Sequence, residues 1–237
     1  DRRVADMKPF PELLESELAG PLGLTGLYCG VPADQQDRCA ELMAAGMEGS
    51  PEEQGRRTAR VRERAGTWRN RLSKVGVRWD PTEAIDALVA PEMHELDFNG
   101  EAFRAASIPA AIGMFTARSL ARLYACLAGG GELDGVRLLS SEGVWRASQE
   151  QNRGVGRVIP VSMRWRLGYH RVFALRAKVP AGFGHFGFGG SGAWADPTRQ
   201  LSVALTVNSG VGTPFGDTRI ARLGGAAVRC ADRAMRR

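Results

Sequence analysis

Apolar residues recur at helical spacing in the first part of the chain and alternate with polar residues in much of the second part. The helical spacing predicts a first helix over 9–19 and a second that begins after an N-cap at Asp34. It also predicts helices over 117–128, from a cap at Ser140 or Ser141 to about residue 148, and over 217–236. Alternation predicts extended segments over 136–139, 158–161, 165–172, 184–195 and 201–208. Helices followed by an antiparallel meander and a closing helix indicate an α+β fold.

Turn and cap residues set the ends of these elements. Thr116 is the expected N-cap of helix 117–128, Gly20-Pro21 is expected to end the first helix, and 196–200 reads as a hairpin turn. The residues expected to face inward from the second and last helices are Cys39, Leu42 and Met43, and Ile220, Leu223, Ala227 and Ala231.

Length and composition fit one globular domain or part of a larger one. The 237 residues are 43% apolar and 24% charged, which excludes wholesale disorder. No run of eighteen apolar residues occurs, so we expect no membrane-spanning helix. The first residue is Asp1, so either the N-terminus was processed or Asp1 is not the biological start.

The formal charge of +6 is unevenly spread, because residues 54–79 hold nine basic side chains against Glu63. Apolar residues within this stretch predict an amphipathic helix to about residue 73. A solvated arginine face is the favoured interpretation. Binding of an anionic surface or nucleic acid through Arg56–Arg78 is the alternative, although no nucleic-acid motif accompanies the stretch.

Other reactive residue types form no recognised metal or cofactor motif. Cys29, Cys39, Cys126 and Cys230 have no C-x-x-C spacing and read as reduced, small apolar residues, with a disulfide left open. His94 and His170 are isolated and read as structural. Ser191 lacks the final glycine of a G-x-S-x-G elbow and reads as a small strand residue.

The segment from Phe183 to Gly192 is the most informative for chemistry, because five glycines surround His185. Glycine within a strand marks a bulge or the close approach of a ligand or backbone. A histidine beside accessible backbone N–H donors suits charge stabilisation at an oxyanion. A sheet edge with a structural histidine is the plain alternative, and a phosphate loop is disfavoured because no G-x-x-x-x-G-K-[ST] occurs.

Three stretches, in order, resemble the penicillin-binding-protein-like serine hydrolases, the group of class C β-lactamases and family VIII carboxylesterases. Residues 17–24 resemble the family's PLG segment, and 108–122 resemble its G-x-x-(S/T)-(T/A)-x-x-D-L-A-R helix start, with Ser119 in place of the Asp. Residues 183–197 resemble (F)GHxGxGGSxxxxDP, followed by an apolar strand ending in Asn208. The resemblance implies a β-lactamase/transpeptidase-like fold, with an antiparallel sheet flanked by helices.

The resemblance also implies roles in acyl transfer. His185-Phe186-Gly187 would be the H-x-G form of the third motif, with His185 contacting substrate or the catalytic network and Gly187 letting substrate approach the strand. The backbone N–H of Phe188 would be an oxyanion-hole donor, and Asn208 would contact substrate. No cofactor or metal is implied.

The chain departs from the family pattern in its first two motifs. No Ser lies three residues before Lys8, Lys74 or Lys178, so S-x-x-K is absent, and no tyrosine begins a Y-x-N. In the family both motifs precede the PLG segment. We therefore expect residues 1–237 to be a single partial domain, helical and irregular over 1–98 with a basic insertion at 54–79, and inactive alone. Missing N-terminal strands would leave an unpaired sheet edge and favour self-association.

Three functional hypotheses remain. The leading one is the C-terminal part of a serine acyl hydrolase, acting on carboxylic esters more readily than on β-lactams because the third motif is H-x-G. The second is a truncated or degenerate, non-catalytic paralogue that binds a ligand or partner. The third is an anion-binding module that uses the arginines of 56–79.

Overall fold

The computed structural model describes residues 8–43, 96–156, 158–187, 189–209 and 217–237, together with 56, 59, 60, 63, 66, 67, 80, 83 and 87. Phe188, His94 and most of the predicted basic helix lie outside the described residues. Among the helices of the described part, none is both long and apolar enough to cross a membrane.

The centre of the described fold is an antiparallel meander of four strands, as predicted from the sequence. The strands are β5 (His170–Arg171), β6 (Phe183–Phe186), β7 (Gly192–Asp196) and β8 (Leu201–Leu205), in the spatial order β5-β6-β7-β8. Gly184 pairs with Trp194 and His185 with Ala193, which fixes the register of β6 on β7. The turn over 196–200 joins β7 to β8 as expected.

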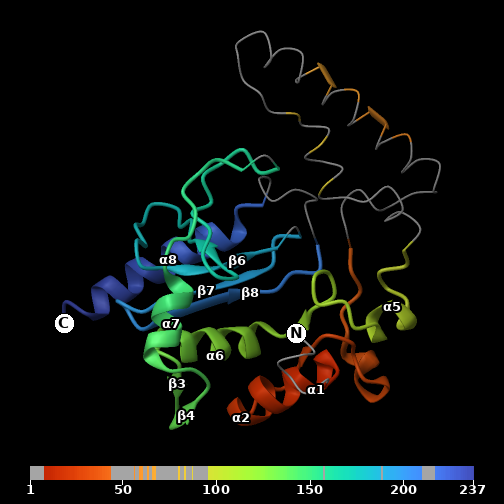
Figure 1. Cartoon of the computed structure of the whole chain (residues 1–237), viewed down its shortest axis with the longest axis horizontal. Helices are drawn as coiled ribbons and strands as arrows, with labels where there is room; N and C mark the ends of the chain where they lie inside the picture. The colour runs from red at the N-terminus through yellow and green to blue at the C-terminus, as the bar shows by residue number, and fades with distance from the viewer. Residues whose placement is uncertain are drawn as a thin grey trace.

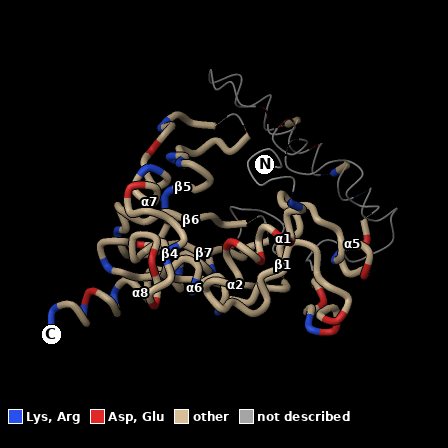
Figure 2. The backbone as a smooth tube through the Cα atoms, turned by 60° about the horizontal axis from the view of Figure 1, so that its bottom comes forward, with Lys and Arg blue, Asp and Glu red and all other residues tan. Residues whose placement is uncertain are grey.

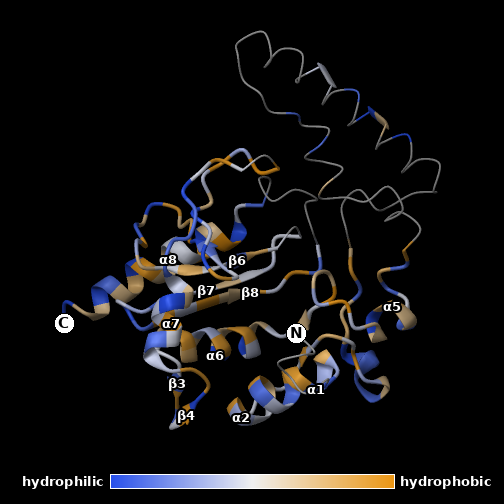
Figure 3. Cartoon of the chain, viewed as in Figure 1, coloured by the Kyte–Doolittle hydropathy of each residue, from blue (hydrophilic) through white to orange (hydrophobic). Residues whose placement is uncertain are grey.

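Helices cover both faces of this sheet (Figure 1). Ala193 and Ala195 pack with Tyr124 and Leu127 of α6 (Ala117–Ala128), and α7 (Ser141–Ser148) adds Val144 to the same cluster. Trp194 points the other way and packs with α8 (Arg219–Ala234) through Ile220 and Val228, among others. Strict alternation along β7 therefore divides the core into two layers, with apolar strands between amphipathic helices (Figure 3).

Two of the predicted helix caps, Thr116 and Ser140, are present. The Thr116 hydroxyl accepts the N–H of Ser119 at the start of α6, and the Ser140 hydroxyl accepts the N–H of Gly143 at the start of α7. Gly130 and Gly131 adopt positive φ after α6, where the chain turns into a hairpin of β3 (Glu132–Leu133) and β4 (Val136–Arg137). These local signals are strong because unpaired helix-end groups demand partners.

The first helix extends past the predicted break. It runs through α1 (Phe10–Leu14), a π-helical turn η1 (Glu15–Ala19) and α2 (Gly20–Leu22), and Gly23 ends it at φ +60°. The wider π turn ends at Ala19, two residues before Pro21, whose missing N–H would interrupt a regular α-helix. Ala19 and Leu22 are buried against Cys126, so tertiary packing favours the continued helix.

The segment after α2 is tied to the start of α6. β1 (Leu27–Tyr28) pairs with β2 (Met114–Phe115), and Arg122 donates to the carbonyl of Leu22. Ser119, where the family motif has Asp, is buried and donates to the carbonyl of Thr25 at 2.7 Å. Ser119 therefore fastens the N-terminal segment to the helix.

The predicted helix with an Asp34 cap is wrong in kind. The structure has a short 3-10 helix, η2 (Ala33–Arg38), capped at Pro32, and Leu42 and Met43 are exposed, not inward. The chain leaves helical geometry because its backbone has other partners: the N–H of Leu42 donates to Asn99 and that of Met43 to the carbonyl of Asn208. α5 (Glu101–Ala105) follows Asn99.

Three strand predictions and one helix face also need correction. Residues 158–161 form no strand, and of 165–172 only β5 and a bridge at Trp165 are extended. The expected single strand over 184–195 is two strands joined by a turn at 187–191. Leu223 of α8 is 43% exposed, because the buried stripe runs through Ile220, Gly224 and Val228.

Charged residues are spread along the whole described chain, with basic residues recurring along α8 toward the C-terminus (Figure 2). Cys29 and Cys126 are buried, Cys39 is partly buried, Cys230 is exposed, and all four are free thiols. The expectation that cysteines serve as small apolar residues is therefore confirmed for Cys29 and Cys126, and Cys230 departs from it.

Candidate active site

His185 lies near the end of β6 and its side chain reaches solvent. Phe183, two residues earlier and on the same face of the sheet, is fully buried. The face of β6 thus passes from core to surface between these two residues. The ordinary strand pairing with Ala193 holds the backbone of His185 in place.

The imidazole of His185 has no hydrogen-bond partner among the described residues, while burial by surrounding protein atoms lowers its pKa below the ordinary value. The His185 side chain is exposed, yet enough protein surrounds it to disfavour the charged form. At neutral pH the ring is therefore neutral, with one donor and one acceptor nitrogen free for a ligand.

A second histidine lies beside it. The rings of His170 and His185 are 5.2 Å apart between centroids. His170 is 1% exposed, its Nδ1 lies 2.7 Å from the carbonyl oxygen of Arg171, and its Nε2 accepts the N–H of Phe186 at 2.9 Å. The structural reading of His170 is confirmed, and sequence reasoning missed its contact with the H-x-G segment.

These bonds fix the protonation of His170. Since Nε2 accepts, the proton is on Nδ1 and is donated to the Arg171 carbonyl. Burial, above all, lowers the pKa of His170 to about 4. Both histidines are thus neutral at pH 7, and only His185 presents its ring to solvent.

Gly187 begins the turn that follows β6. Its N–H donates to the carbonyl of Ser191 at 2.7 Å, and the N–H of Gly190 donates to the carbonyl of Gly187 at 3.1 Å. A Cβ at Gly187 would meet only that Ser191 oxygen, at 3.3 Å, among described atoms outside its chain neighbours. The outer side of Gly187 is therefore open, as the predicted approach of substrate requires. The predicted oxyanion donor, Phe188, lies outside the described residues.

Ser191 is held by backbone bonds, which agrees with its reading as a structural residue, but it lies in the turn before β7 and not on the strand as predicted. Its hydroxyl accepts the N–H of Val207 at 3.0 Å and donates to the carbonyl of the same residue at 3.4 Å. This pair links the start of β7 to the chain after β8. No described side chain that could act as a base is bonded to this hydroxyl.

Asn208 connects this region to a polar cavity. Its side-chain N–H donates to the carbonyl of Glu41 at 3.0 Å. Asn99 holds the next residue, Leu42, through both its amide oxygen and its amide nitrogen.

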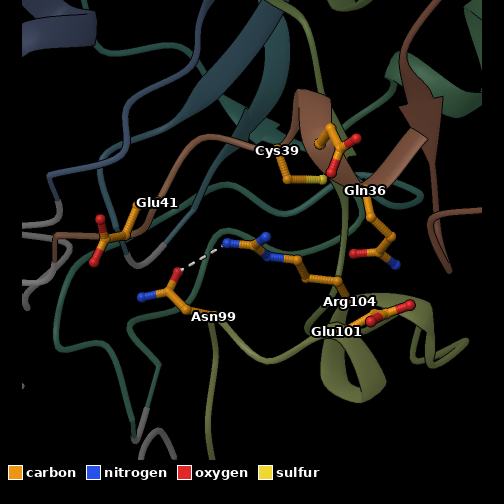
Figure 4. Close-up of a pocket in the computed structure, with 7 residues that line it drawn as sticks. Gln36, Cys39, Glu41, Asn99, Glu101 and Arg104 are labelled. Carbon is orange, nitrogen blue, oxygen red and sulfur yellow. Dashed lines mark hydrogen bonds between the residues drawn. The ribbon is translucent and has the colours of Figure 1, made fainter. Parts of the chain in front are cut away.

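The cavity beside these residues has a volume of about 490 Å³ and is lined by Gln36, Cys39, Glu41, Asn99, Glu101 and Arg104, among others (Figure 4). Arg104 points into it and donates to Asn99 at 3.3 Å. In the described structure His185 and Gly187 do not line the cavity, so it marks the neighbourhood of Asn208 only.

Known proteins match almost the whole chain. The family model named Beta-lactamase matches residues 2–227. The chain is 37% identical over 208 residues to Esterase/beta-lactamase LipL of Mycobacterium tuberculosis, covering 87% of this chain and 44% of that protein.

Solved structures give the same picture. A family VIII carboxylesterase has a TM-score of 0.72 and 30% identity, and the match covers 97% of this chain and 54% of the carboxylesterase chain. A penicillin-binding protein homologue from Caulobacter crescentus has a TM-score of 0.70, with the same identity and coverage. EstA from Arthrobacter nitroguajacolicus, at 22% identity and a TM-score of 0.69, supports the fold alone.

The chain spans about half the length of these relatives. The predicted fold class, an α+β β-lactamase/transpeptidase-like fold, is confirmed by the described sheet and by these neighbours. With a family match over nearly all of its residues, the chain belongs to the Beta-lactamase family of β-lactamase-like serine hydrolases.

Proposed function

We propose that this chain is the C-terminal part of a serine acyl hydrolase that cleaves small carboxylic esters, and that β6 is the strand along which substrate lies. One observation carries the proposal. His185 of the H-x-G segment is exposed, neutral at pH 7 and without a described hydrogen-bond partner, although the two residues before it in β6, Phe183 and Gly184, are buried. A residue in that state, one position past the last β5–β6 pair, is available to bind a ligand.

The reaction assigns a part to each predicted residue. A serine oxygen attacks the ester carbonyl carbon, the alcohol leaves with a proton, and water then releases the carboxylic acid from the acyl-enzyme. His185 would hydrogen-bond the substrate or the attacking serine. Gly187 would give room on the strand, and the N–H of Phe188 would stabilise the oxyanion. Asn208, which follows β8, would contact the remainder of the substrate.

The nucleophile has to come from outside this chain. None of its lysines belongs to an S-x-x-K, and the chain spans only 44% of its esterase relative. We propose that the serine, lysine and tyrosine belong to a longer polypeptide of which these residues form a part. The chain alone would then bind substrate weakly and turn over none.

The first test is the intact mass of the native polypeptide in its source. A product larger by about 100 to 200 residues, a domain's worth, supports the proposal. A product near 25.6 kDa contradicts it and favours the alternative, a non-catalytic paralogue that binds a ligand or partner through the same cleft.

The second test is hydrolysis by that native polypeptide of p-nitrophenyl acetate and of the β-lactam nitrocefin. We expect the ester to be preferred, and His185→Ala to lower kcat/KM for it on the order of a hundredfold. His185→Gln, which keeps a hydrogen-bonding side chain, should recover part of the loss. Trp145→Ala, on the exposed surface of α7, is the matched control and should be neutral. Unchanged turnover in His185→Ala would refute the role of His185.

A further inference from the structure

β5 stops pairing with β6 before the H-x-G segment is complete. His170 pairs with Gly184, and the chain before it turns away: Gly168 has φ +82°, and the N–H of Arg166 donates to the carbonyl of Tyr169. The backbone of β5 therefore offers no acceptor to Phe186. An edge N–H of this kind needs another partner or water.

The imidazole of His170 fills that place. Its Nε2 accepts the Phe186 N–H at 2.9 Å, and its Nδ1–H is fixed on the carbonyl of Arg171, so the ring is held at both nitrogens. Trp165, Phe173 and Phe186 surround the ring, with centroids 5.9, 6.2 and 5.0 Å away. A buried ring with two hydrogen bonds has a single orientation.

Phe186 is the central residue of the H-x-G segment. Its N–H points toward β5, while the N–H of Gly187 points the other way, to Ser191. The bond to His170 thus fixes the peptide between His185 and Phe186, and the His170 ring also contacts the His185 ring. The strand edge beyond Phe186 is left free of β5.

We propose that His170 is a positioning residue of the active site: its imidazole ends the β5–β6 ladder at Phe186 and thereby orients the strand that carries His185 and Gly187. The role of His170 in catalysis rests on the proposed function, whereas its hydrogen bond to Phe186 does not depend on that function. A histidine suits this task because one rigid ring bridges a donor and an acceptor on neighbouring strands.

Two isosteric variants separate the two bonds. In His170→Asn the side-chain amide can still reach the Arg171 carbonyl but has no atom at the Nε2 position. In His170→Gln the amide oxygen can occupy the Nε2 position and accept the Phe186 N–H. The pair therefore tests the acceptor itself and not the mere presence of a polar side chain.

The measurement is NMR of the chain at pH 7, with ¹⁵N shifts of the histidine rings and amide exchange at Phe186. In the wild type we expect His170 protonated at Nδ1 only, and a protected Phe186 amide. His170→Asn should speed exchange at Phe186 about fivefold or more and shift the His185 ring signals. His170→Gln should keep most of the protection. A wild-type ring protonated at Nε2, or equal exchange in both variants, would overturn the proposal.

The wild-type ring shifts decide the tautomer even where a variant fails to fold. In the native polypeptide, His170→Asn should lower kcat for the ester on the order of tenfold, and His170→Gln should restore it. If the native polypeptide hydrolyses no ester, the proposed function fails while the NMR result still decides the His170 bond. If ester turnover is normal in a well-folded His170→Asn, the positioning role is wrong.

Discussion

Asp217 occupies the space in which a side chain at Gly190 would stand. A Cβ atom on Gly190 would lie 1.9 Å from Oδ2 of Asp217, and Gly190 has φ +91°. Arg219 pairs with Asp217 and donates to the carbonyl of Ser209 at 2.7 Å. The turn after the H-x-G strand is thus packed directly on the start of α8.

Gly190→Ala should therefore destabilise the chain by roughly 2 to 4 kcal/mol, from the left-handed backbone and the displaced carboxylate together. Gly135→Ala is the matched control. Gly135 has φ +79° and no described atom within 4 Å of an added Cβ, so backbone strain of about 1 kcal/mol remains. Urea unfolding of both variants makes the comparison, and equal losses would contradict the packing of Asp217 on Gly190.

Asp217 should also contribute to acid sensitivity. Hydrogen bonding by the Arg219 side chain, the largest cause, lowers the pKa of Asp217 below its ordinary value. A carboxylate whose folded pKa is depressed stabilises the fold above the unfolded value of 3.8, and this stability is lost as pH falls through the folded pKa. Asp217→Asn should cost about 1 to 2 kcal/mol at pH 7 and less below pH 4. A constant difference at all pH values would argue against the pair.

Sequence reasoning succeeded where local chemistry decides the structure. Thr116 and Ser140 cap helices because their hydroxyls satisfy N–H groups three residues on, and alternation predicted β7. It failed where distant partners decide. The apolar spacing of Leu42 and Met43 predicted a helix, but Asn99 and Asn208 take their backbone N–H groups.

The candidate site divides in the same way. The glycine-rich segment around His185 was visible as a pattern, yet its split into two strands depends on the turn at 187–191. The run from Gly189 to Gly192 carried a turn signal that the strand prediction overrode. The contact of His170 with Phe186 joins residues sixteen positions apart and has no signature in a single sequence.

Ser191 should be chemically silent. Its hydroxyl is bonded to the backbone of Val207, and no described base activates it. A fluorophosphonate probe should therefore leave Ser191 of the isolated chain unlabelled. Ser191→Ala should cost about 1 kcal/mol of stability through the lost hydrogen bonds. Mass spectrometry after probe treatment checks the first statement, and a phosphonylated Ser191 peptide would refute it.

His170 should give stability a pH dependence at mildly acidic pH. Its folded pKa of about 4 lies below the ordinary 6.5, with burial as the main cause and His185 and Arg166 as smaller ones. Below pH 6.5 the unfolded chain binds a proton that the folded chain does not, so stability falls as pH drops toward 4 and then levels off. The effect is on the order of 3 kcal/mol for this buried ring.

His170→Gln, which does not titrate, should reduce the slope of the unfolding free energy between pH 6.5 and 4, and the remaining slope should come from His185, whose pKa burial also lowers. The slope below pH 4, to which Asp217 contributes, should remain. Chemical denaturation at intervals of half a pH unit separates the two windows. An unchanged slope between pH 6.5 and 4 in this variant would show that His170 is not the group responsible.

The outer edge of β8 should govern association of the isolated chain. β8 is the last strand of the described sheet, pairs only with β7 among the described strands, and holds Leu201, Val203 and Leu205 against α8. An apolar strand with an open edge is a template for pairing with another strand. We expect the mass measured by sedimentation to rise with concentration in the micromolar range, and thermal unfolding to be broad. Joining the chain to the longer polypeptide proposed above should abolish both effects, because its remaining strands would cover that edge. A monodisperse monomer of the isolated chain with a sharp, high melting transition would show that β8 needs no such partner.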